Sequence, residues 1–174
     1  MKIRTETPAD FDRVAEVITA AFGEPDEATL IDALRADECW IPELVLVAED
    51  GNGRVIAHSV ITRATIGTTQ SLTLAVVSVD PAHQGTGTGT RIIRAGLDTA
   101  RARGEHTITV LGHPGYYPRF GFEPAADHGV TCTLSAGPEA GKMVMSLDGA
   151  PIPQGDMGFG KPLAEAVAAY QPES

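Results

Sequence analysis

A run of alternating glycine and threonine residues is the feature of this sequence best suited to chemistry. It follows a stretch rich in β-branched residues that ends at Val79, and it leads into a helical pattern through Ile92 and Leu97. Glycines let the backbone turn tightly and approach a ligand closely. Unpaired N–H groups at the start of a helix converge where its dipole is positive, which attracts anions. The segment therefore predicts a phosphate site, made by Gln84, Gly85, Thr86, Gly87, Thr88, Gly89 and Thr90.

Two common phosphate-binding motifs do not fit this loop. The dinucleotide fingerprint G-x-G-x-x-G requires a third glycine where this sequence has Thr90. A P-loop requires Gly-Lys followed by Ser or Thr, and here Gly89 is followed by Thr90 and Arg91. Arg91 and Arg94, three residues apart on the predicted helix, can add cationic contacts to a second phosphate.

A second motif downstream gives the loop a specific interpretation. Read as Gln84-x-x-Gly87-x-Gly89, the loop resembles the acyl-CoA pyrophosphate loop of the GNAT superfamily of N-acetyltransferases. The stretch from Tyr117 to Gly121-Phe122 is similar to that family's Tyr-x-x-x-Gly-Phe segment. Residues 112–122 also resemble a branch of predicted acetyltransferases with a Gly-x-Pro-x-Tyr-Tyr-x-Arg-Phe-Gly-Phe signature, and the strong similarity covers residues 74–124.

The resemblance implies acetyl-CoA as co-substrate, with no metal. Backbone groups of Val77, Ser78 and Val79 would pair with the pantetheine arm like an added strand, and residues 84–90 would hold the pyrophosphate. The N–H of Val79 would donate to the thioester carbonyl. Tyr117 stands where the family places the tyrosine that protonates the departing CoA thiolate. The amine would attack the thioester directly in a ternary complex, so no protein nucleophile is expected.

The sequence also departs from the family pattern. Many members have an asparagine shortly after the strand that follows the pyrophosphate helix, where this chain reads Leu111-Gly112-His113-Pro114. No glutamate stands on the strand before the loop, so the general base stays open among Glu24, Glu43, His58, His113 and water.

The elements that would position these residues indicate an α/β (α+β) fold with the GNAT-like acyl-CoA N-acyltransferase architecture. We expect a twisted, mixed, mostly antiparallel sheet, splayed near residues 74–79, with helices on both faces. Residues 1–148 are predicted to form the acetyltransferase domain, and residues 149–174 a loop and a short helix packed on it. Residues 130–134 and 143–147 are expected to form a final antiparallel pair, and residues 149–160 an ordered loop or lid.

Composition limits the partners. The 174 residues carry 13 basic and 23 acidic side chains, a net charge of −10, which argues against general binding to nucleic acid or anionic membranes. Cys39 and Cys132 are too few for a disulfide framework. We find no signal peptide or membrane-spanning run and therefore expect a cytoplasmic protein. The charge favours a cationic amine acceptor, either a small molecule or a peptide, and a homodimer is compatible with the sequence.

Together these features predict an N-acetyltransferase that moves an acetyl group from acetyl-CoA to a primary amine. The alternative is a non-catalytic acyl-CoA-binding sensor or regulatory module. A structural or interaction protein, in which residues 84–89 form an ordinary turn, is the third possibility. The sequence does not identify the acceptor, the acyl-chain preference or the oligomeric state.

Overall fold

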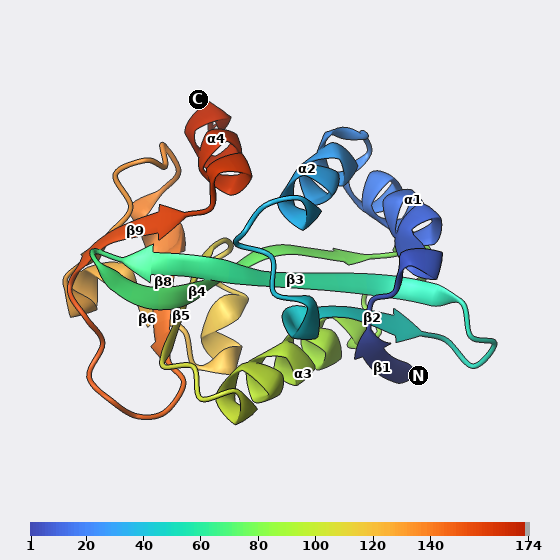
Figure 1. Cartoon of the computed structure of the whole chain (residues 1–174), viewed down its shortest axis with the longest axis horizontal. Coiled ribbons are helices and arrows are strands. Elements are labelled where there is room, and N and C mark those ends of the chain that lie inside the picture. Colours follow the sequence, from blue (N-terminus) through green and yellow to red (C-terminus); the bar gives the residue numbers. More distant parts are fainter. Residues whose placement is uncertain (173–174) are drawn as a thin grey trace.

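A computed structural model describes residues 1–172, which form a nine-stranded mixed sheet with helices on both faces (Figure 1). The main strand order is β1-β2-β3-β4-β5-β8-β6, and β9 joins the sheet beside β3 and pairs with β7. All pairs are antiparallel except β4 with β5 and β7 with β9. The strands are β1 (Lys2–Thr5), β2 (Val45–Glu49), β3 (Val55–Ile66), β4 (Thr69–Val79), β5 (Thr107–Leu111), β6 (Glu123–Pro124), β7 (Val130–Thr131), β8 (Lys142–Ser146) and β9 (Gly155–Phe159).

The helices divide between the two faces of the sheet. Helices α1 (Phe11–Phe22), α2 (Asp26–Arg35) and α4 (Lys161–Ala169) lie above the sheet in Figure 1, and α3 (Thr88–Ala102) lies below it. Buried side chains of α1 and α2 form one core cluster with Val60 of β3, and Ile93 and Leu97 of α3 form another with Ile61. Neighbouring residues of β3 point to opposite faces, so one strand supports both layers. This arrangement confirms the predicted fold class.

Local sequence signals set the entry to α1. Thr7 and Asp10 form a capping box: the carboxylate of Asp10 accepts from the backbone N–H of Thr7 at 2.8 Å. Pro8 occupies the first position of the turn that precedes the helix, where its missing N–H is harmless. Gly23 ends α1 in the left-handed conformation, with φ of 78°. These signals fix where α1 begins relative to the end of β1, close to the buried carboxylate of Glu6.

Strand β4 leaves its parallel partner partway along its length. Residues 72–74 of β4 pair with residues 108–110 of β5, but β4 continues to Val79 without that neighbour. The register with β3 shifts at the same place, because Val60 faces Val76 whereas Ile61 faces Leu74, which leaves Ala75 unopposed. A bulge of this kind bends its strand. The sheet is therefore splayed where the sequence indicated, with one edge of residues 75–79 open.

The C-terminal third of the sheet corrects two expectations. Residues 130–134 and 143–147 do not pair with each other: β7 pairs in parallel with β9, and β8 pairs with β5 and β6. The segment expected as a loop or lid contains β9, which pairs with residues 64–66 of β3. Its glycines permit this close approach, because a Cβ at Gly158 would lie 2.3 Å from Oγ1 of Thr65. Within residues 1–172, no helix is long and apolar enough to cross a membrane.

Candidate active site

The glycine-rich loop has the backbone shape that phosphate sites use. Gly85 and Gly87 adopt φ of 74° and 84°, a region that favours glycine, and α3 begins directly after them at Thr88. Hydroxyl groups line the same turn, since Oγ1 of Thr86 lies 2.9 Å from Oγ1 of Thr88. The amide of Gln84 donates to the carbonyl of Val79 at 3.0 Å, so this side chain ties the loop to the end of β4.

The first turn of α3 has N–H groups that no acceptor inside the helix engages. The first main-chain bond of α3 runs from the N–H of Arg91 to the carbonyl of Gly87 at 3.0 Å. The N–H groups of residues 88–90 precede that bond and have no acceptor within the helix. Donors left free at a helix N-terminus, where the helix dipole is positive, form a ready anion site. The loop can therefore bind a diphosphate through its main chain.

The alternation of backbone groups determines which residues of β4 face the open edge. Asp80, just after the strand, donates its N–H to the carbonyl of Ile56 in β3 at 2.8 Å. Successive residues of a strand point their backbone N–H and C=O groups to opposite edges, so the groups of Ser78, two residues before Asp80, also face β3. The backbone groups of Val77 and Val79 point the other way, towards the splay. Of the three residues expected to bind the pantetheine arm, Val77 and Val79 are thus available and Ser78 is not.

Tyr117 lies on the far side of the splay in a short 3₁₀ turn, residues 117–120. Its ring packs edge-on against Tyr116 and Phe122, with centroid distances of 5.1 and 6.0 Å. Burial, with a smaller contribution from Tyr116, raises the pKa of the Tyr117 hydroxyl. Within the described part of the chain this hydroxyl has no hydrogen-bond partner. It is therefore a protonated, uncommitted donor, as a general acid requires.

Gly112 lies in the segment after β5 where the sequence departs from the family pattern, and it contacts the ring of Tyr117. A Cβ at this position would lie 2.3 Å from Cε2 of Tyr117. The backbone is held there because the N–H of Gly112 donates to the carbonyl of Gly141 at 2.9 Å. Only glycine allows the tyrosine ring to lie against the end of β5. Sequence reasoning noted the departure but had no signal for this contact.

A second contact that the sequence did not reveal links the tyrosine turn to α3. The hydroxyl of Tyr116 lies 3.1 Å from Oγ1 of Thr90, in the first turn of the helix. A Cβ at Gly89 would lie 3.5 Å from Cγ2 of Val79 and 3.6 Å from the Tyr116 hydroxyl. The end of β4, the start of α3 and the tyrosine turn therefore meet at Gly89.

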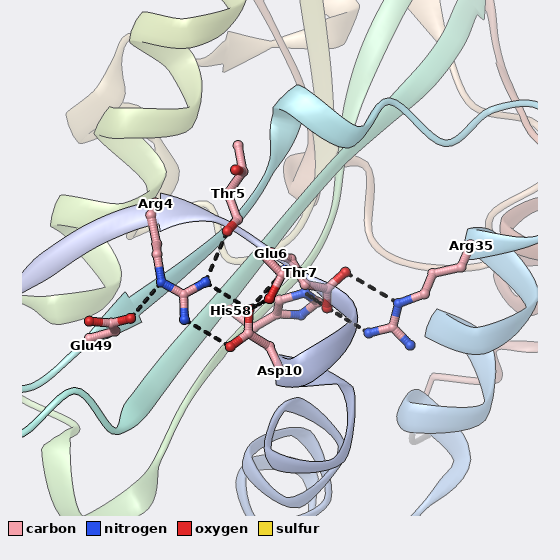
Figure 2. Close-up of polar contacts among 8 residues, drawn as sticks. All are labelled: Arg4, Thr5, Glu6, Thr7, Asp10, Arg35, Glu49 and His58. Atoms are coloured by element: carbon pink, nitrogen blue, oxygen red, sulfur yellow. Dashed lines mark hydrogen bonds and ion pairs between the residues drawn. The ribbon is translucent and has the colours of Figure 1, made fainter.

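Of the candidate bases, His58 is enclosed in a buried ionic cluster. Its Nε2 lies 3.1 Å from Oε1 of Glu6, and the side chains are 0% and 5% exposed. Arg35 donates to both oxygens of the same carboxylate, at 2.6 and 3.2 Å (Figure 2). Burial alone would raise the pKa of Glu6, but the contacts with His58 and Arg35 outweigh it and lower this pKa. His58 therefore belongs to the scaffold that joins β1, β3 and α2.

The other candidate bases lie at the surface. Glu24, Glu43 and His113 are exposed, and Glu43 forms an ion pair with Arg103 at 3.2 Å.

The two arginines considered for a second phosphate differ in their contacts. Arg94 donates to the carbonyl of Arg119, whereas Arg91 is exposed on α3. In residues 1–172 no group of three or more His, Cys, Asp or Glu side chains could hold a metal ion.

Comparisons with known proteins agree with this geometry. The sequence model of the acetyltransferase (GNAT) domain matches residues 2–125. The N-acetyltransferase YjhQ of Escherichia coli K12 is 43% identical over 122 residues, which are 68% of this chain and 67% of YjhQ.

Two solved structures share the whole architecture. The GNAT family N-acetyltransferase YhbS of Escherichia coli, in complex with CoA, superposes with a TM-score of 0.82 at 28% identity, covering 92% of this chain and 90% of YhbS. A GNAT family acetyltransferase of Brucella melitensis, in complex with acetyl-CoA, gives 0.76 at 32% identity, covering 92% and 96%. The splayed sheet, the glycine loop and the family match over most of its length together show that this chain belongs to the GNAT acetyltransferase family.

Proposed function

We propose that the chain transfers an acetyl group from acetyl-CoA to a primary amine by direct attack within a ternary complex. The observation that carries this proposal is the glycine loop with left-handed Gly85 and Gly87, which leads into α3 so that the N–H groups of residues 88–90 have no acceptor within the helix. Donors at an exposed helix N-terminus are hydrated in the free protein and can exchange water for phosphate oxygens when a ligand binds. The related structures from Escherichia coli and Brucella melitensis hold CoA and acetyl-CoA, which supports the same ligand here.

The main chain supplies the binding site for the cofactor arm. The diphosphate lies on the N–H groups of the loop and of the first turn of α3, where the helix dipole stabilises negative charge. The pantetheine arm follows the open edge of β4 and pairs with backbone groups of Val77 and Val79. This recognition needs few cationic side chains, which is consistent with a chain whose net charge is −10.

The chemistry then requires one acid. The lone pair of the neutral amine attacks the thioester carbonyl carbon and forms the C–N bond, while the N–H of Val79 stabilises the carbonyl oxygen. The C–S bond breaks, and the hydroxyl of Tyr117 gives its proton to the departing sulfur. Solvent then reprotonates the phenolate. The raised pKa of Tyr117 keeps it protonated at neutral pH before the attack.

The proton of the amine leaves through water in this proposal. His58 is 0% exposed and held beside Glu6, so it does not meet a substrate, while Glu24, Glu43 and His113 lie at the surface. The acidic surface favours a cationic amine, whether a small molecule or a peptide. A cytoplasmic location and a homodimer remain predictions from the sequence.

The test measures CoA release with a panel of primary amines: alkyl diamines, amino acids, and peptides with a free N-terminus or a lysine. Wild type should release CoA with at least one amine, and Tyr117→Phe should lose about 100-fold in kcat. The affinity for acetyl-CoA should change less than about twofold, because the ring and its packing remain. Equal turnover by wild type and Tyr117→Phe would remove the acid role, and binding without turnover would favour the sensor.

The chain's own thiols are suited to such an assay. Cys39 and Cys132 are both buried, and burial raises the pKa of Cys39 to about 12. Because the thiolate is the reactive form, these side chains react slowly with a chromogenic thiol reagent. The signal therefore reports released CoA.

A further inference from the structure

We propose that Tyr116 is a positioning residue, whose hydrogen bond to Thr90 holds the acid Tyr117 at a fixed place relative to the pyrophosphate helix. The inference rests on the proposed function, because it assigns Tyr117 the role of acid. It adds a role to Tyr116, the first tyrosine of the pair, which lies outside the Tyr-x-x-x-Gly-Phe segment.

The contact joins two segments that have no strand pairing between them. The hydroxyl of Tyr116 and Oγ1 of Thr90 are 3.1 Å apart, although the residues are 26 positions apart in sequence. Thr90 lies in the first turn of α3, whose free N–H groups form the proposed diphosphate site. The bond therefore ties the tyrosine turn to the part of the helix that would hold the cofactor.

The ring of Tyr116 transmits this constraint to its neighbour. It packs edge-on against Tyr117 at 5.1 Å and against Phe120 at 5.4 Å between centroids. On another side the guanidinium of Arg119 lies 4.2 Å from its centroid, and the Nε of Arg119 donates to the carbonyl of Tyr116 at 2.8 Å. With the ring enclosed in this way, a shift of Tyr116 away from α3 also displaces the ring of Tyr117.

The folding stability of the protein depends little on the hydroxyl of Tyr116. Phe120 and Phe122 anchor the turn in the core at 7% and 2% exposure, whereas Tyr116 is only half-buried. One hydrogen bond in a half-buried place contributes little to folding. Its placement matters for catalysis, because a small displacement of a reacting group lowers the rate much more than it lowers binding.

The test is a double-mutant cycle on kcat, using the amine found for the wild type. Tyr116→Phe and Thr90→Val each remove one partner, and each should lower kcat about tenfold with less than about a threefold change in the Kd of CoA. The double variant should be no worse than either single variant, because both remove the same bond. Thr90→Ser, which keeps a hydroxyl, should regain most of the kcat that Thr90→Val loses.

Thr99→Val is the matched control. It makes the same substitution on the same helix and removes a hydroxyl that donates to the carbonyl of Ala95 at 2.9 Å, away from the site. Its kcat should equal that of wild type. Additive losses in the double variant, an unaffected kcat in either single variant, or an equal loss in Thr99→Val would overturn the proposal.

Failure of the proposed function has a different signature. If wild type turns over no amine at all, the enzyme assignment fails, and crystal structures of the CoA complexes then decide the positioning role. In Thr90→Val the turn at residues 113–121 should move away from α3, while the loop at residues 84–90 keeps its contacts with the diphosphate. An unmoved Tyr117 ring in that structure contradicts the proposal independently of turnover.

Discussion

The glycine loop and the ionic cluster around Glu6 use polar groups in opposite ways. In the cluster, Glu6, just after β1, is removed from water and accepts hydrogen bonds from Arg35 of α2, and Nε2 of His58 in β3 lies 3.1 Å from the same carboxylate (Figure 2). In the loop, the N–H groups at the start of α3, residues 88–90, have no acceptor within the helix. Polar groups that satisfy one another hold elements together, and polar groups left without partners at a surface are available to a ligand.

The same contrast separates the two kinds of candidate residue. His58 combines a chemically useful side chain with complete burial and an ionic neighbour, and its place indicates a scaffold role. Tyr117 combines a partly buried ring with a hydroxyl that no described residue engages, and its place indicates chemistry. Residue type alone would rank the histidine first, whereas partners and exposure reverse the order.

The largest effect is expected from breaking the buried cluster. Glu6→Gln leaves the guanidinium of Arg35 facing a neutral side chain in a site that is 5% exposed at Glu6, which should cost about 3 kcal/mol of unfolding free energy. Acetyl-CoA affinity of the folded fraction should not change. Urea denaturation and calorimetric binding measure both quantities.

Asp98→Asn is its control, because it breaks the exposed ion pair with Arg101 at 3.3 Å and should cost less than about 0.5 kcal/mol. Equal losses in Glu6→Gln and Asp98→Asn would mean that the cluster is not a stabilising unit.

The next largest effect is a loss of kcat when the ring of Tyr117 is displaced. Gly112→Ala places a Cβ 2.3 Å from Cε2 of Tyr117, so the ring must move, and kcat should fall about 100-fold. Gly115→Ala is the matched control in the same segment, because a Cβ there meets nothing within 4 Å. Steady-state turnover and thermal unfolding should show a selective loss of activity in the first variant. A full kcat in Gly112→Ala would show that the ring position does not matter.

The smallest effect is a pH dependence of stability. Hydrogen bonds from Arg4 lower the pKa of Asp10 to about 2. Because the folded pKa lies below the unfolded one, this contribution is present above about pH 4 and is lost as the pH falls towards 2. Asp10→Asn should therefore flatten the acid side of the plot of unfolding free energy against pH, by about 1 kcal/mol at most. The exposed Asp12→Asn should keep the steep wild-type limb, and identical slopes in both variants would exclude the Asp10 contribution.

The sequence predicted the parts of the fold that depend on local signals. The glycine loop before α3 was predicted from its own contiguous sequence, and the structure has it. The sequence did not predict β9, because that strand contains Gly155 and Gly158 and forms only through close contact with β3. It also could not pair Glu6 with Arg35 and His58, which lie 29 and 52 positions away along the chain.

The candidate site divides in the same way. The loop was identified from its own glycines, and Tyr117 from the resemblance of residues 117–122 to the family's Tyr-x-x-x-Gly-Phe segment. The use of Val77 and Val79 rather than Ser78 depends on strand register, which is set by the hydrogen bond from Asp80 to Ile56. The contacts of Gly112 and Tyr116 depend on how the turn folds back over β5 and α3.

The most direct test of the account is calorimetric titration of acetyl-CoA into wild type, Gly87→Glu and Gly104→Glu. Both glycines have positive φ, 84° and 81°, and open space around the Cβ position, so the two substitutions carry similar strain. Only Gly87 lies in the loop. We expect micromolar binding to wild type, similar binding to Gly104→Glu, and a loss of at least about 100-fold in Gly87→Glu. Equal affinity in all three proteins, or no binding to wild type, would contradict the assignment of residues 84–90 as the diphosphate site.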